Sequence, residues 1–211
     1  MATVFSPPEQ RVVLTGVSWN TYERLLIDLE NQSAPRLTFD RGLLEIMSPS
    51  GEHERYNRTI SLLVEVLAEE LDIDVDNLGS TTFRREDIER GFEPDSCFYI
   101  RHAEAVRGKA RIDLANDPAP DLVIEIDITS GSLDKFPIYA QVGVPEIWRF
   151  DGSDLTIFRL VSGSYERLDV SSAFPLMTSG VLTGFIRESE TLRRTAWLRK
   201  LRAWIDEHRK R

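Results

Sequence analysis

The segment 121–127, Asp-Leu-Val-Ile-Glu-Ile-Asp, combines an apolar core pattern with carboxylates at alternate positions. Successive side chains of a β-strand point to opposite faces, so Leu122, Ile124 and Ile126 predict a face packed in the core. The opposite face then carries Asp121, Glu125 and Asp127 beside a valine. Unpaired charge on a central strand is unfavourable unless a cation or protons compensate for it. A divalent metal is the simplest compensation, so this strand predicts a metal site.

Length and composition favour one well-packed domain over residues 1–211. The chain is 41% hydrophobic, and its apolar runs fall short of the roughly 18 residues that a membrane span needs. The first eight residues lack the basic and apolar regions of a secretory signal. The single cysteine, Cys97, excludes an intramolecular disulfide and is typical of a buried filler. We therefore expect a cytoplasmic protein without membrane contact.

The charge is unevenly distributed along the chain. A formal net charge of -9 disfavours a protein that coats nucleic acid non-specifically, but it leaves room for a nuclease whose acidic site is neutralised by metal. Basic residues concentrate near the C-terminus, where about 191–209 predicts an amphipathic helix with two tryptophans on its apolar stripe. Such a helix is more often a solubilising surface than a nucleic-acid surface, and its tryptophans also suit a dimer interface.

Periodicity and turn residues predict a mixed order of helices and strands. Ser18 caps a first helix that runs through Leu29, and Gly42 supplies a tight turn between two strands. The predicted helices are 18–29, 52–71, a short one within 101–120, 132–142 and 191–209. The predicted strands are 36–40, 43–47, 80–85, 95–100, 121–128, 146–151, 155–160 and 164–168, with a polar turn at 86–93. This order indicates an α+β (mixed α/β) fold.

Two of the predicted strands begin with a Pro-Asp pair, at Asp95 and at Asp121. Proline is tolerated at the first residue of a strand, so one such pair is unremarkable. If the two strands are neighbours, however, Asp95 and Glu125 converge on one cation. Lys135, in the first turn of the helix after the acidic strand, could reach back over the strand's end, and His53 begins the inward face of the helix 52–71.

Carboxylates, a lysine and a divalent ion together suit phosphodiester hydrolysis. Hard oxygen ligands hold Mg²⁺ or Mn²⁺, the metal lowers the pKa of a bound water, and a lysine stabilises developing negative charge. Structural interpretations stay open for several residues. Asp121 is equally explained by hydrogen bonds to a neighbouring loop, Lys135 by a solvated position and His53 by packing. Asp127, at the strand's end, is expected to face solvent.

Several motifs occur together in this chain: Pro120-Asp121-Leu122-Val123-Ile124-Glu125-Ile126, Leu133-Asp134-Lys135, Ile138-Tyr139-Ala140 and Gly143-Val144-Pro145-Glu146-Ile147-Trp148, preceded by Glu45 through Ser48-Pro49, His53 and Pro94-Asp95. In these motifs the chain resembles the Uma-two family of bacterial restriction-endonuclease-like proteins, within the PD-(D/E)XK nuclease superfamily. The resemblance spans roughly residues 37–151, and its most specific part is the Gly-Val-Pro-Glu-Ile-Trp segment. It implies a restriction-endonuclease-like central mixed β-sheet flanked by helices, a divalent metal and cleavage of a nucleic-acid backbone.

The resemblance also implies roles for individual residues. Asp95 matches the first motif aspartate and Glu125 the acidic residue of the (D/E)XK element, while Asp127 stands where the motif lysine is expected. Lys135 matches a lysine that the family often keeps in the following helix. The expected site is therefore Asp95, Glu125, Lys135 and His53, with metal held by Asp95, Glu125 and Asp121.

The leading hypothesis is a metal-dependent endonuclease acting on nucleic acid, with DNA the first candidate and a homodimer a reasonable expectation. The missing motif lysine and the acidic net charge also favour a rival, a nuclease-fold interaction module that has lost cleavage. A metal-dependent hydrolase of another phosphoester is the third hypothesis.

Overall fold

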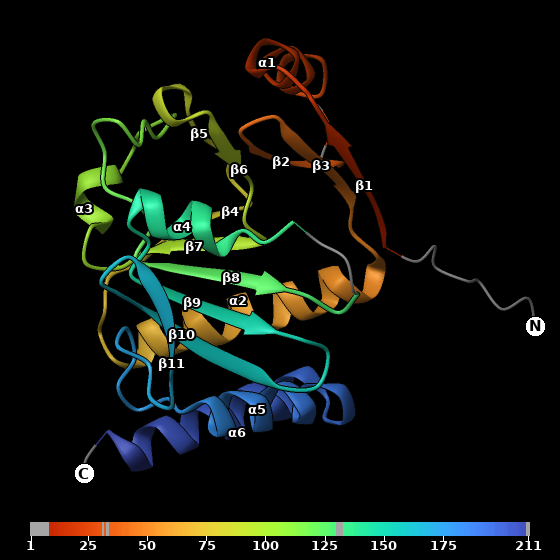
Figure 1. Cartoon of the computed structure of the whole chain (residues 1–211). Helices are drawn as coiled ribbons and strands as arrows, with labels where there is room; N and C mark the ends of the chain where they lie inside the picture. The colour runs from red at the N-terminus through yellow and green to blue at the C-terminus, as the bar shows by residue number, and fades with distance from the viewer. Residues whose placement is uncertain (1–8, 31, 33, 130–132, 210–211) are drawn as a thin grey trace, which may run out of the picture.

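The computed structural model describes residues 9–30, 32, 34–129 and 133–209, which form two β-sheets and the helices around them (Figure 1). The larger sheet has six strands in the order β11-β10-β9-β8-β7-β4. They are β4 (Asp76–Gly79), β7 (Ser96–Tyr99), β8 (Leu122–Ile126), β9 (Glu146–Phe150), β10 (Leu155–Val161) and β11 (Ser164–Leu168). β8 and β9 run parallel while their other neighbours are antiparallel, so the expected mixed central sheet is confirmed.

The smaller sheet is antiparallel, with five strands in the order β1-β3-β2-β6-β5. They are β1 (Gln10–Thr15), β2 (Arg36–Asp40), β3 (Leu43–Ser48), β5 (Phe83–Arg85) and β6 (Arg90–Phe92). The hairpin of β2 and β3 confirms the predicted turn, in which Gly42 has a φ of +92°. Helix α1 (Trp19–Asp28) packs on this sheet, and the Ser18 hydroxyl caps it by accepting a hydrogen bond from the Thr21 amide.

Helices cover both faces of the six-stranded sheet. On one face lie α2 (Gly51–Glu70), α5 (Ser179–Thr191) and α6 (Arg194–His208), and on the other lies α4 (Phe136–Val142). The short α3 (Ala103–Val106) lies in the predicted loop region, and a 3₁₀ turn spans Glu86–Ile88. Among the described residues, no helix is both long and apolar enough to cross a bilayer.

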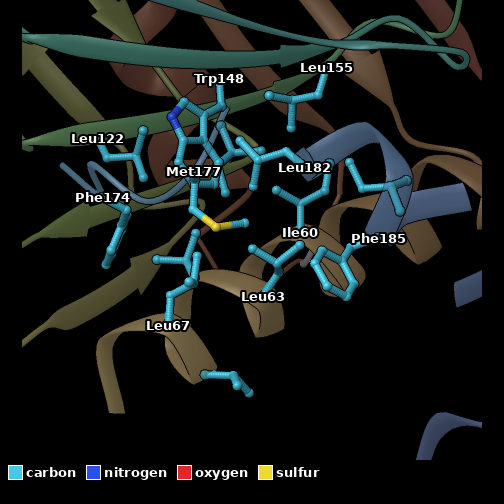
Figure 2. Packing of buried hydrophobic residues seen from close by; sticks show 14 of the residues in the cluster. Ile60, Leu63, Leu67, Leu122, Trp148, Leu155, Phe174, Met177, Leu182 and Phe185 are labelled. Carbon is cyan, nitrogen blue, oxygen red and sulfur yellow. The ribbon is translucent and has the colours of Figure 1, made fainter. Parts of the chain in front are cut away.

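The alternation along β8 divides the apolar core as predicted. Leu122, Ile124 and Ile126 pack in one cluster with residues of α2, α5 and α6. Figure 2 shows Leu122 in this cluster beside Trp148, Met177 and Phe174. Neighbouring Val123 points the opposite way, into the cluster beneath α4. Glu125, two residues further along, therefore faces the α4 side of the sheet. Cys97 is a fully buried member of the α4-side cluster, and burial raises the pKa of its thiol to about 12.

Four features differ from the predicted elements. The segment 80–85 is not one strand, because its chain leaves the six-stranded sheet at β4 and joins the five-stranded sheet at β5. The segment 86–93 contains β6 as well as a turn. The helix expected over 132–142 begins at Phe136 within the described residues, and residue 132 lies outside them. The C-terminal helix begins at Arg194 rather than 191.

Besides β4, two elements had no sequence-based prediction, β1 and α5. β1 has apolar residues at three successive positions, without the alternation that marks a half-buried strand. α5 contains two glycines, which weaken its helical pattern. Both are stabilised by partners distant in the chain, β3 for the strand and β10 for the helix.

Candidate functional site

The candidate site is centred on Glu125, near the end of β8. The Lys135 ammonium lies 2.9 Å from Glu125 Oε2, and the Tyr139 hydroxyl donates to Oε1. Lys135 precedes α4 instead of lying in its first turn, yet its side chain reaches back to the strand and is only 7% exposed. Burial and the neighbouring Glu125 raise the pKa of Tyr139, so its hydroxyl remains a donor. The structure thus brings together two of the predicted site residues, Glu125 and Lys135.

Asp95 lies just before β7 and is almost completely buried. β7 and β8 pair in antiparallel register, with Ser96 opposite Ile124, so the next pair places Asp95 opposite Glu125. The two strands that begin with a Pro-Asp pair are therefore neighbours. Asp95 Oδ1 accepts a hydrogen bond from Arg36 of β2, and Oδ2 accepts one from the Ile126 amide at 2.7 Å. The charge of Asp95 is therefore compensated by an arginine of the other sheet.

His53, in the first turn of α2, has no exposed surface. Its Nε2 lies 3.2 Å from Asp95 Oδ1 and 3.8 Å from Glu9 Oε2, but neither ring nitrogen makes a hydrogen bond to a described residue. Burial, with the positive charge of Arg36 as the next cause, lowers the pKa of His53 to about 4. His53 is therefore neutral at pH 7 and contacts Asp95 without adding charge.

Glu9, just before β1, and Arg11, within β1, form an arm that closes one side of the site. Arg11 donates from Nε to Glu9 Oε1 at 2.6 Å and from Nη1 to Glu45 Oε1 at 3.3 Å. The second Glu45 oxygen accepts from the Leu133 amide at 2.8 Å, next to the α4 segment. The second oxygen of Glu9 is buried and unpartnered among the described residues. No local sequence pattern singled out Glu9, Arg11 or Arg36, because their partners lie far along the chain.

Asp121 lies at the opposite end of β8 from the site. It is four positions before Glu125, about 13 Å along the strand. Its carboxylate accepts from the Ile100 and His102 amides at 2.8 and 3.0 Å, and its other oxygen lies 2.9 Å from His102 Nδ1. This arrangement matches the structural interpretation of Asp121, and the structure does not bring Asp121 together with Asp95 and Glu125.

A small cavity of about 50 Å³ opens beside Glu125. It is lined by Arg11, Glu125, Ile126, Asp127, Leu133, Asp134, Lys135, Phe136 and Arg149. Because one water molecule needs about 10–15 Å³, the cavity holds roughly three to five water-sized groups. Asp127 is half-buried here, rather than turned fully to solvent as expected.

A much larger groove, about 1160 Å³, lies elsewhere, between α1, β5 and residues 110–115. It shares Arg36 and Glu93 with the surroundings of Asp95 but contains neither Glu125 nor Lys135. Its charged lining comprises Arg36, Arg84, Arg85, Arg111, Glu23, Glu30, Glu86, Asp87, Glu93 and Asp113. Carboxylates outnumber guanidinium groups in this lining, which would repel a phosphate backbone. We therefore assign the candidate catalytic site to the small cavity and not to the large groove.

The donor set beside the small cavity is suited to magnesium or manganese. Mg²⁺ is commonly held by one or two carboxylates, with waters and substrate phosphates completing its shell. Glu125 presents a hard oxygen donor to a polar, water-sized space. Among the described residues, no three His, Cys, Asp or Glu side chains form a ready-made metal cluster. Asp95 would join Glu125 as a ligand only after releasing Arg36.

Comparisons with known proteins bear on the fold and the family of this chain. A crystal structure described as a putative nuclease belonging to DUF820, from Anabaena variabilis ATCC 29413, is similar with a TM-score of 0.57. The similarity covers 81% of this chain and 99% of that one at 14% identity, so it supports the restriction-endonuclease-like fold alone. No curated protein matches the chain. The family model Uma2, described as "Putative restriction endonuclease", matches residues 19–187, and the chain belongs to this family.

Proposed function

We propose that this protein is a metal-dependent endonuclease that hydrolyses phosphodiester bonds of nucleic acid at the cavity beside Glu125. The single observation that carries the proposal is the buried ion pair between Lys135 and Glu125, formed at a water-sized cavity. This chain has Asp127 where the family pattern expects a lysine, and Lys135, whose ammonium lies 2.9 Å from Glu125 Oε2, would take the role of that lysine. A solvated surface lysine would show neither this burial nor this contact.

Each residue would contribute a distinct step. A Mg²⁺ or Mn²⁺ ion held by Glu125, with Asp95 as a second carboxylate, would supply Lewis-acid activation of water and phosphate. Lys135 would stabilise the negative charge that develops on the phosphate and orient the attacking water. Tyr139 fixes one oxygen of Glu125, so the other stays directed toward Lys135. His53, neutral and packed against Asp95, would position that carboxylate.

The charge around the two cavities favours approach of nucleic acid from the Glu125 side. Arg11, Lys135 and Arg149 line the small cavity and balance its three carboxylates. The large groove instead has an excess of carboxylates, which repel a phosphate backbone. We therefore propose that the scissile phosphate binds over Lys135 and Arg149, with DNA as the first substrate to test.

Cleavage assays test this function directly. Purified protein is incubated with supercoiled plasmid, single-stranded DNA and RNA, in Mg²⁺, in Mn²⁺ and with a chelator. We expect metal-dependent nicking that falls at least about 100-fold in Glu125→Gln and in Lys135→Met, because each removes a group from the charge-stabilising centre. The matched controls are Glu166→Gln on exposed β11 and Lys109→Met in a surface ion pair, which should cleave normally.

One observation favours the rival, a nuclease-fold interaction module that does not cleave. Arg36 already neutralises the charge of Asp95, so this carboxylate does not require a metal ion to compensate for it. If no nucleic acid is cleaved and calorimetry detects no binding of Mg²⁺ or Mn²⁺, the endonuclease proposal is wrong and the module is supported. Turnover of bis(p-nitrophenyl) phosphate without cleavage of any polymer would instead support a hydrolase of another phosphoester.

A further inference from the structure

β1 is an open edge of the five-stranded sheet. Among the described strands it pairs only with β3, and Figure 1 shows no described element beyond its outer side. Three consecutive apolar residues lie on this edge strand: Val12 is 54% exposed, Val13 44% and Leu14 43%. An exposed apolar edge strand presents unpaired backbone donors and acceptors, so its natural partner is another β-strand.

Both faces of the edge are apolar. Val12 and Leu14 pair with Ile46 and Leu44, which contact the cluster beneath α1, so these two residues belong to the α1 face. Val13 pairs with Glu45 and belongs to the opposite face, toward the candidate site. A strand added at this edge would therefore gain apolar contacts above and below the sheet.

The edge also lacks the charge that usually prevents strands from associating. Monomeric proteins commonly place an outward lysine or a proline on such an edge. The only charged residue of β1 is Arg11, whose side chain is 10% exposed and bonded to Glu9 and Glu45. Although the chain has a net charge of -9, β1 itself carries only this paired arginine, so a second β1 can approach with little repulsion between the two strands.

We propose that two copies of this chain dimerise by antiparallel pairing of β1 with β1. In a two-fold arrangement centred on Val13, this residue lies opposite Val13 of the partner subunit, and Val12 lies opposite the partner's Leu14. Every central pair is then apolar, which is the self-complementarity that a two-fold interface requires. The two five-stranded sheets would join into one continuous sheet of ten strands (5 + 5).

The interface has a consequence for the candidate site, and this consequence rests on the proposed function. β1 carries Arg11 and directly follows Glu9, so pairing at the edge would fix the arm that closes the site. The two-fold axis is perpendicular to the joined sheet, because paired residues must point to the same face. Both sites would then open on the same face of the ten-stranded sheet, as an enzyme that cuts both strands of a duplex requires.

Light scattering coupled to size-exclusion chromatography tests the dimer without metal or nucleic acid, so its result is independent of any cleavage. We expect wild-type protein at about 50 μM to have twice the mass of one chain. Val13→Lys places two like charges together at the axis and should weaken association at least about 100-fold, giving a monomer. The matched control is Val170→Lys, equally exposed at 43% but distant from β1, which should remain a dimer.

Two further measurements keep the result unambiguous. Circular dichroism and thermal unfolding must show that Val13→Lys is folded, and amide exchange of β1 should be slower in wild type than in this variant. A protein that starts at Glu9 should still dimerise. The proposal is overturned if wild-type protein is a monomer, if Val13→Lys still dimerises, or if dimers form only after residues 1–8 are removed.

Discussion

Acid should destabilise this protein in the range between neutral pH and pH 5, and His53 is the group responsible. Its imidazole is fully buried beside Asp95, and burial together with Arg36 lowers its pKa to about 4. In the unfolded chain a histidine titrates near 6.5. Between these values the unfolded state binds more protons than the folded state, so the free energy of unfolding must rise with pH.

The size of the effect follows from the two pKa values. At pH 7 histidine is mostly neutral in both states, and the difference in protonation contributes almost nothing. At pH 5 the unfolded state is protonated while folded His53 is not, and the linkage relation gives a loss of about 2 kcal/mol relative to pH 7. Glu93 acts in the opposite direction, because burial raises its pKa, so wild-type protein alone would underestimate the contribution of His53.

The measurement is urea unfolding followed by tryptophan fluorescence at pH 5 and pH 7, in a metal-free buffer. His53→Leu removes the titrating ring and both unpartnered nitrogens while keeping a buried side chain of similar size. Wild type should lose about 2 kcal/mol more than His53→Leu on going from pH 7 to pH 5. His208→Gln, near the end of α6, should behave like wild type. If His53→Leu shows the same pH dependence as wild type, the reasoning is wrong.

Three further predictions concern stability, all measured by urea unfolding. Glu146, fully buried, accepts hydrogen bonds from the Trp148 indole and from three groups of a distant loop. Glu146→Ala leaves these donors unpaired and should cost about 4 kcal/mol or more; a loss below about 1 kcal/mol would contradict this. Gly91→Ala would place a Cβ 2.1 Å from the buried Tyr22 hydroxyl and should cost about 3 kcal/mol. Gly184→Ala in α5, with nothing within 4 Å, should instead add about 0.5–1 kcal/mol.

Local sequence patterns predicted the elements whose signals are complete within one segment. The helical stripe of α2, the Gly42 turn between β2 and β3, and the alternation of β8 all appear as expected. In each case the pattern reports which side of an element is buried, and that is decided by spacing along the chain. Boundaries shifted most where the chain passes from one sheet to the other, between β4 and β6.

Local sequence patterns could not predict which distant segments pair with one another. β1 becomes a strand because it pairs with β3, whose residues lie 28 to 38 positions further along the chain, although its own residues show no alternation. Arg36 was predicted only as the start of a hairpin strand, yet it neutralises Asp95 across 59 residues of chain. Glu9 likewise reaches His53 from a part of the chain outside the matched family region. Tertiary packing alone brings these charges together.

The sequence by itself determined that β8 has one apolar face and one face with a carboxylate near its end, and that Glu125 needs a compensating partner. It also placed Lys135 soon after that strand. The tertiary structure decided how the charges are matched: Lys135 and Tyr139 on Glu125, and Arg36 on Asp95. Periodicity fixes the direction in which a side chain points, whereas the identity of its partner depends on how separate elements pack.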